Sequence, residues 1–443
     1  MTLDQGSEAQ ARATAPRTPT DTTRRAWWVV AMLVLFIVVN YADKVVVGIA
    51  GVDMIRDLGI DSTRYGVVQS SFFWFFAVGS LAGGLLIGRI KARWLLAGTA
   101  GLWVLSMLPA VWSSSFAVIV ACRMLLGFAE GPASAMAMSV THSWFRPEKR
   151  ALPTSFVTAG ASVGPLLSAP LLTEVIISHS WHAAFAVLAV AGVLWTAVWL
   201  FVGREGPESG AAATHPTTVP LPDRVPLRRL FGTRTVIGVH ILFFAAYCSA
   251  SVKISWMPLY LREGLGYDAR TAGQLVTLPY AATALFIILS GFVSRALTER
   301  GVPNRITRGL IPCALMGAGG LCTLGLGMAG RGPLLIVLIV CGASLTTGGM
   351  GLAYATVSDV APAGQRGLVM SCVVAAFSVG GMVAPLVLGN LIDSAATPLD
   401  GYSTGFLLIG AVLVIGSLSA GCLINQDRDA RLLGAWAKNE ITT

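Results

Sequence analysis

Charged side chains are scarce in this sequence. Lys, Arg, Asp and Glu together make up 12% of its 443 residues, whereas a soluble domain has about a quarter. Hydrophobic residues, by contrast, make up 55% of the chain. This balance excludes an ordinary soluble domain and indicates a protein whose surroundings are largely lipid.

The motifs of catalysis are missing as well. The sequence has no nucleotide-binding loop, no metal-ligand constellation and no pairing of a nucleophile with a base. Its seven cysteines lack metal-ligand spacing, and their odd number argues against a disulfide framework. We therefore expect neither an enzyme nor a cofactor nor a bound metal, and we interpret the cysteines as small packing residues.

Long apolar stretches, in contrast, are abundant. Each is long enough to cross a hydrocarbon core about 30 Å thick as a helix. They predict an all-α integral membrane protein with twelve transmembrane helices. The predicted spans are 26–50, 65–88, 94–112, 115–141, 150–178, 182–203, 234–262, 271–296, 305–329, 332–360, 365–394 and 402–425.

The net charge of +9 would suit a nucleic-acid partner, but the placement of the basic residues explains it better. An even number of spans puts both termini on one side, and 23 of the 31 Lys and Arg residues fall on that side, against five on the other. Positive residues beside short loops are retained in the cytoplasm. We therefore predict a multi-pass cell-membrane protein with both termini in the cytoplasm and no nucleic-acid partner.

One long polar segment, residues 204–233, divides the spans into two sets of six. It contains five prolines and a basic cluster, which is typical of a linker. A weak repeat supports the division, because the Ser-Val-Gly of residues 162–164 recurs at residues 378–380. Duplicated halves with a substrate site between them are a common transporter plan. The predicted organisation is a disordered cytoplasmic tail (1–23), an N-terminal half (24–203), the cytoplasmic linker (204–233), a C-terminal half (234–425) and a cytoplasmic tail (426–443).

Five ionisable residues lie inside the predicted spans. Each costs about 2.5–3.5 kcal/mol at a helix centre, so such residues pair, face water or act in transport. Helix rise places four of them at similar height on three helices, with one carboxylate about 10 Å deeper. The four are Asp43, Lys44, Arg123 and Lys253, and the deeper carboxylate is Glu130.

Two interpretations of these charges stay open. They could be buried ion pairs that hold the bundle together, for example Asp43 with Arg123. Alternatively, Lys253 leaves the set at +1 and so favours an anion, while a carboxylate among cations can exchange a proton. Polar and aromatic residues lie nearby, although packing or a place in the interface belt explains each aromatic better than ligand contact does. These residues are Asn40, Tyr41, Trp74, Tyr247, Ser251 and Trp256.

The fourth span contains Arg123, Gly127, Glu130 and Pro132, and a basic loop ending at Arg150 follows it. With Tyr41, Asp43 and Lys44 in the first span, this pattern resembles the major facilitator superfamily. The similarity is to its anion:cation symporter branch, which includes bacterial sugar-acid carriers and animal vesicular glutamate and sialic acid transporters. The resemblance implies a twelve-helix fold in two halves. It also implies that Asp43 and Glu130 handle protons and that Lys44 and Arg123 bind the substrate carboxylate.

The sequence departs from this branch in its gating loops and in its pocket. An aspartate is usual where Gly88 and Arg295 stand, so we expect an unusual balance between inward and outward states. Sugar-acid carriers tend to have Tyr, Gln and Asn where this chain has Phe76, Ala161 and Ser378. The loss of these hydrogen-bonding groups favours a less hydroxylated anion, either aromatic or carrying a second acidic group.

The sequence thus predicts a monomeric secondary transporter that moves a small organic anion with protons by alternating access. A proton-driven efflux antiporter for an acidic metabolite or drug remains an alternative, and a transporter-like membrane sensor a remote one. The predicted residues are Asp43 and Glu130 for proton coupling; Lys44, Arg123, Lys253, Tyr41, Asn40, Trp74, Phe76 and Ser378 for the substrate; and Gly84, Arg89 and Arg295 for the gating loops.

Overall fold

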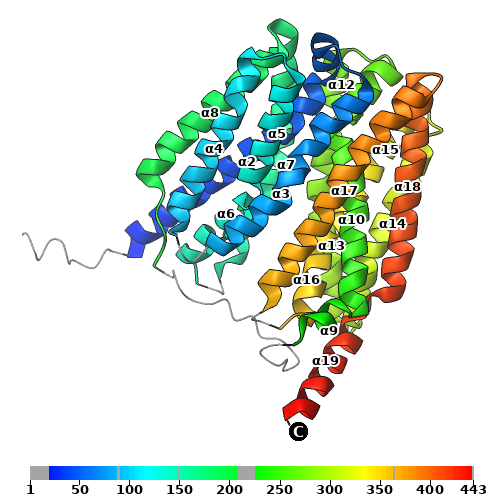
Figure 1. The fold of residues 1–443 in the computed structure, drawn as a ribbon. Helices are drawn as coiled ribbons and strands as arrows, with labels where there is room; N and C mark the ends of the chain where they lie inside the picture. The colour runs from blue at the N-terminus through cyan, green and yellow to red at the C-terminus, as the bar shows by residue number, and fades with distance from the viewer. Residues whose placement is uncertain (1–18, 87–89, 147–148, 208–224, 363–364, 442–443) are drawn as a thin grey trace, which may run out of the picture.

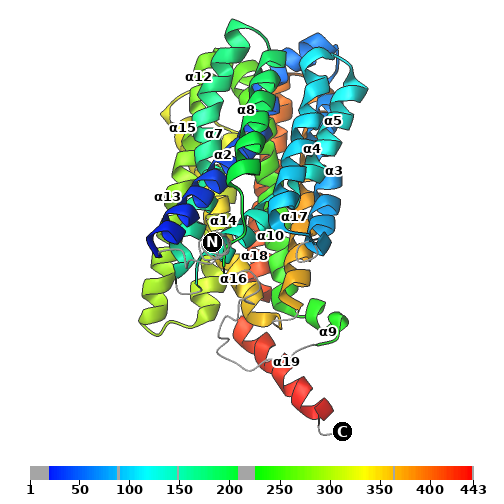
Figure 2. The ribbon, with the colours of Figure 1, turned by 90° about the vertical axis from the view of Figure 1, so that its left-hand side faces the viewer.

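The chain folds into an all-helical bundle (Figures 1 and 2). The structure, a computed structural model, describes residues 19–86, 90–146, 149–207, 225–362 and 365–441. Within these ranges, twelve helical segments are long and apolar enough to cross a membrane, which confirms the predicted twelve spans. In lipid a backbone must satisfy its own hydrogen bonds, so continuous apolar runs of this length adopt helices.

The first six spans comprise seven helices. Their bounds are α2 (Pro19–Leu58), α3 (Ser62–Leu86), α4 (Ala92–Trp112), α5 (Phe116–Glu130), α6 (Ala133–Trp144), α7 (Ala151–Ser178) and α8 (Trp181–Val202). Helix α2 begins inside the segment predicted as a disordered tail, and the remainder of that tail, residues 1–18, lies outside the described residues. The fourth span breaks into α5 and α6 at Gly131 and Pro132, where proline supplies no N–H for the helical ladder.

The second six spans follow the same plan with more interruptions. Their elements are α10 (Arg234–Ser255), α11 (Met257–Leu259), the π-helical turn η2 (Tyr260–Gly264), α12 (Ala269–Leu275), α13 (Leu278–Glu299), the π-helical turn η3 (Arg305–Leu310), α14 (Ile311–Leu326), α15 (Pro333–Gly348), α16 (Met350–Val360), α17 (Arg366–Ser394) and α18 (Pro398–Leu423). Between the two sets lies the short helix α9 (Leu227–Phe231), within the predicted linker.

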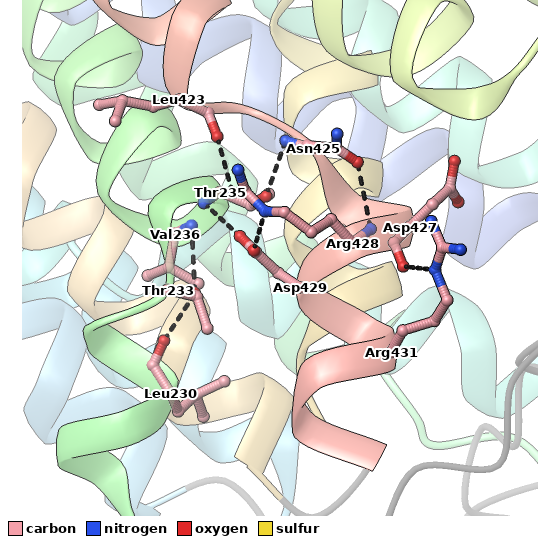
Figure 3. Close-up of polar contacts among 10 residues, drawn as sticks. All are labelled: Leu230, Thr233, Thr235, Val236, Leu423, Asn425, Asp427, Arg428, Asp429 and Arg431. Carbon is pink, nitrogen blue, oxygen red and sulfur yellow. Dashed lines mark hydrogen bonds and ion pairs between the residues drawn. The ribbon is translucent and has the colours of Figure 1, made fainter. Parts of the chain in front are cut away.

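The predicted C-terminal tail is helical, forming α19 (Gln426–Ile441), and a polar network ties its start to the first turn of α10 (Figure 3). The Asp429 carboxylate is 2% exposed and accepts a hydrogen bond of 2.8 Å from the Thr235 backbone N–H. Arg428 Nε donates to the same carboxylate at 2.8 Å. An anion at a helix N-terminus is stabilising, so this joint orients α19 against the bundle.

Close helix approach depends on glycine at the contacts nearest the centre. A β-carbon at Gly127 of α5 would collide with the backbone carbonyl of Phe72 on α3. Small residues allow such backbone contact between membrane helices. This packing brings the middle of α3 against the middle of α5, where the charged residues of the fourth span lie.

The two sets of six helices are tied together at one end of the bundle, which we call the closed end. Asp53 of α2 forms an ion pair of 3.0 Å with Arg262 of η2, and Glu174 of α7 forms another of 3.0 Å with Arg270 of α12. The Asp393 carboxylate at the end of α17 accepts hydrogen bonds from the first residues of α3. Its donors are Ser62 N at 3.0 Å, Thr63 N at 2.7 Å and Thr63 Oγ1 at 2.6 Å.

The ion pair between Asp53 and Arg262 joins the two sets of helices, and both side chains are largely buried. At the same end a β-carbon at Gly48 of α2 would collide with the backbone carbonyl of Ile254 of α10. The ribbons of the two sets separate toward the other end, where both described termini lie (Figure 1). The structure therefore describes a state that is held shut at one end.

The Asp393→Ala substitution is expected to loosen the closed end. It removes three hydrogen bonds to a charged acceptor, each worth about 1.5–3 kcal/mol, and a loss of 1.4 kcal/mol already shifts a conformational equilibrium tenfold. In a variant without native cysteines, maleimide labelling of Ser255→Cys, 2% exposed at the closed end, should accelerate about tenfold or more. The control is Asp400→Ala, because Asp400 bonds Thr397 of its own helix. Equal labelling of both variants would contradict a role of Asp393 in holding the closed end shut.

Candidate functional site

The centre of the bundle contains an ion pair between the first and fourth spans. Lys44 Nζ on α2 lies 2.9 Å from Glu130 Oε2 at the end of α5, and their side chains are 13% and 1% exposed. Lys44 Nζ also donates to Asn40 Oδ1 at 2.8 Å, one turn earlier on α2. Because residues four apart share a helix face, Asn40 steadies the ammonium where Glu130 meets it.

Asp43 lies beside this pair but points to a different helix. Successive residues of a helix project about 100° apart, so Asp43 reaches α4 while Lys44 faces α5, and the Asp43 carboxylate still lies close to that of Glu130. The Asp43 side chain is fully buried, and its Oδ2 accepts a hydrogen bond of 2.5 Å from Trp103 Nε1. Its other oxygen has no hydrogen-bond partner among the described residues. Half of this carboxylate is therefore available to a proton.

Trp103 is a functional residue that sequence reasoning missed. It is 2% exposed on α4, in a span with no ionisable residue to draw attention to it. The signal that could have found it is its indole N–H, which needs an acceptor when it is buried.

Arg123 is buried with an incomplete set of hydrogen bonds to its guanidinium. It is 4% exposed on α5, two turns before Glu130, and its Cζ lies 4.8 Å from the centroid of the Phe72 ring. Within the described part of the chain, its Nε and Nη1 have no hydrogen-bond partner. Leaving a buried donor unpaired costs about 1–3 kcal/mol, and more when the group is charged. An arginine kept in this condition is suited to a planar carboxylate that arrives from outside.

Aromatic rings surround these charges. Lys44 Nζ lies 4.2 Å from the ring centroid of Tyr41 and 5.8 Å from that of Phe76. Phe76 in turn lies 5.8 Å from Phe377 of α17, between ring centroids. The structure thus brings together most of the predicted site: Asn40, Tyr41, Asp43, Lys44, Phe76, Arg123 and Glu130.

Three predicted substrate residues lie elsewhere. Trp74 is 39% exposed on the side of α3 that also exposes Phe75 and Val78, away from the charges. Ser378 is 3% exposed, and its hydroxyl donates to the Val374 carbonyl of its own helix at 2.9 Å. Lys253 is the third, and its place is the largest departure from the predicted arrangement.

Lys253 packs inside the second six helices instead of completing the charged layer. It is 7% exposed, and its Nζ lies 5.2 Å from the ring centroid of Tyr280. It lines a cavity of about 20 Å³ with Thr323, Gly342 and Phe406. Helix rise gave the height of Lys253 but not the direction in which its side chain leaves α10. The prediction that Lys253 joins the other four charges and gives them a net charge of +1 is therefore wrong. Without Lys253, the central charges balance.

None of the predicted gating residues that the structure describes forms a hydrogen bond or ion pair between the two sets of helices. Arg295 is exposed and pairs with Glu299 of the same helix at 2.8 Å. Gly84 lies on α3, two residues before its end at Leu86. Arg89 and Gly88 lie outside the described residues. The ties at the closed end were not among the predicted gating residues.

Residues 32–353 match the sequence pattern of the Major Facilitator Superfamily. The chain belongs to this superfamily. This Major Facilitator Superfamily protein is accordingly a multi-pass transporter of the cell membrane and not an enzyme, as its sequence predicted.

Relatives and solved structures agree with this assignment. The chain is 26% identical to a D-galactonate transporter of Escherichia coli O6:H1, over 91% of this chain and 96% of that one. It is 25% identical to a hexuronate transporter of Bacillus subtilis, over 88% and 93%. The fold of this superfamily member also resembles a bacterial homologue of the human lysosomal transporter Spinster, solved inward-facing and unoccupied. The TM-score is 0.74 at 16% identity, covering 94% of this chain and 99% of that one.

Proposed function

We propose that the protein moves a small organic anion bearing a carboxylate, together with protons, by alternating access. The observation that carries this proposal is the buried guanidinium of Arg123, whose Nε and Nη1 have no partner among the described residues. It lies on the same helix as Glu130, which forms an ion pair with Lys44 of α2. The relatives named as transporters of galactonate and hexuronate, both carboxylic acids, support an acidic substrate.

The site suggests how proton and anion could be coupled. Glu130 holds Lys44 at 2.9 Å, so the carboxylate of a substrate must compete with Glu130 for the same ammonium. A proton on Glu130 removes this competitor and releases Lys44, which can then bind the anion together with Arg123. By linkage, a bound anion favours the proton on Glu130 to the same extent that the proton favours the anion. One proton with one monoanion makes the cycle electroneutral.

Orientation follows from the charge asymmetry of the sequence. If the basic side is cytoplasmic, then the closed end faces outward, and the structure corresponds to an inward-facing state. In this proposal the halves are residues 24–203 and 234–425, joined by the cytoplasmic linker of residues 204–233, and the site lies at their interface.

The test uses proteoliposomes with a pH-sensitive dye sealed inside. A panel of organic acids is added outside, with empty liposomes as the correction for passive entry of the neutral acids. We expect one class of acid to acidify the interior, and Asp43→Asn to reduce the rate at least tenfold, because Asp43 is a proposed proton site. Asp427→Asn, at an exposed aspartate of α19, is the matched control and should behave as the wild type. Folded protein that acidifies with no acid would refute proton–anion symport.

A further inference from the structure

Five aromatic rings from both halves of the molecule form one connected group, which we call the ring cluster. Its members are Phe72, Phe73 and Phe76 of α3, Tyr247 of α10 and Phe377 of α17. Tyr247 and Phe377 are stacked, with centroids 4.1 Å apart and an interplanar angle of 18°. Phe73 meets Tyr247 edge to face at 5.9 Å. The cluster therefore spans the interface across which the two halves must move.

The ring cluster also touches the charges of the proposed site. Phe72 lies under the Arg123 guanidinium, with 4.8 Å between Cζ and the ring centroid, and Phe76 lies 5.8 Å from Lys44 Nζ. Phe73 and Tyr247 are only half-buried, although both are in the middle of their helices. A β-carbon at Gly381 would lie 2.6 Å from the Phe73 ring, so this ring lies flat against the backbone of α17. The face of the Phe72 ring thus lies against the Arg123 guanidinium, two of whose nitrogens have no partner among the described residues.

This surface suits a flat apolar body better than a hydroxylated chain. Hydroxyl groups lose their hydrogen bonds to water when they are buried against rings, and that loss is costly unless protein groups replace those bonds. An aromatic ring loses no such bonds and gains stacked or edge-to-face contacts of the kind that these rings already make with one another. Asn40, a nearby amide, is engaged by Lys44 through its Oδ1.

We propose that the substrate of this transporter is an aromatic carboxylate. Its carboxylate binds Arg123 and Lys44, and its ring inserts among Phe73, Phe76, Tyr247 and Phe377. This proposal rests on the proposed function, because it specifies the anion for the same site. Since the ring contacts residues of both halves, substrate binding bridges the interface that alternating access rearranges.

The experiment measures binding to the detergent-purified full chain, so that passive membrane entry plays no part. The probes are benzoate, cyclohexanecarboxylate, which matches its ring size without aromaticity, and gluconate. We expect benzoate to raise the melting temperature and to bind at least tenfold more tightly than gluconate, with cyclohexanecarboxylate between them. Phe377→Leu should reduce binding of benzoate about tenfold and hardly change that of cyclohexanecarboxylate. Phe75→Leu, on the exposed side of α3, is the matched control.

Each outcome decides between the two proposals. Tighter binding of gluconate than of benzoate would overturn the aromatic substrate and leave the proposed proton–anion transport intact. Equal binding of benzoate and cyclohexanecarboxylate, unchanged by Phe377→Leu, would also overturn the aromatic substrate. If folded wild-type protein binds no carboxylic acid and acidifies no liposome, the proposed function fails as well.

Discussion

The Arg123→Met substitution is expected to reduce transport at least a hundredfold while costing less stability than the loss of a buried ion-pair partner. Methionine keeps a long apolar side chain over the Phe72 ring but removes the guanidinium. Removal of the guanidinium relieves the cost of burying unpaired N–H groups, and this relief offsets part of the loss of a positive charge close to Asp43 and Glu130. The substrate carboxylate, in contrast, loses its bidentate partner, and truncating a buried charged partner costs about 2–5 kcal/mol of binding.

This prediction separates a binding arginine from a structural one. If Arg123 were part of an ion pair that holds the bundle together, Arg123→Met would leave its partner buried and unpaired, and stability would fall by about 3–5 kcal/mol. The measurement is the melting temperature of the purified protein together with substrate exchange in proteoliposomes. Arg123→Lys should recover part of the exchange, because it restores the charge but not the planar fork. A drop in melting temperature that corresponds to a loss of about 3–5 kcal/mol would favour the structural role.

The Glu130→Gln substitution is expected to separate exchange from proton-driven accumulation. Glutamine resembles the protonated acid, so Lys44 is released from its ion pair and stays available to the anion at every pH. Exchange of external for internal substrate should therefore continue within about tenfold of the wild-type rate and lose its dependence on pH. Accumulation driven by an inward proton gradient should disappear, since the variant has no proton to carry at this position.

Both activities can be measured in the same proteoliposomes, with substrate counterflow at several pH values and net uptake under an imposed pH gradient. Glu299→Gln is the control, because Glu299 is exposed and pairs only with Arg295 of its own helix among the contacts found for it. Asp43→Asn makes the comparison informative: if it alone abolishes accumulation and Glu130→Gln does not, the proton resides on Asp43. Loss of counterflow in Glu130→Gln would contradict the release of Lys44 by protonation.

The charged residues of the site could be predicted because lipid makes them conspicuous. Asp43, Lys44, Arg123 and Glu130 each impose a cost in a span, and such a cost is visible in the sequence without knowledge of the packing. Trp103 could not be predicted in this way, because a tryptophan in an apolar helix imposes no such cost. Lys253 and Trp74 were assigned by height alone, and height says nothing about the direction in which a side chain leaves its helix.

The sequence by itself determined the class of protein and the plan of twelve spans, since the length of an apolar run and the cost of a charge in lipid are local properties. It also singled out the five ionisable residues of the spans, four of which lie together in the structure. Only the tertiary structure decided that Lys44 pairs with Glu130, that Trp103 holds Asp43 and that Asp53 reaches Arg262. These pairings depend on the rotation of each helix about its axis and on close contacts through residues such as Gly48 and Gly127, which involve segments far apart in the chain.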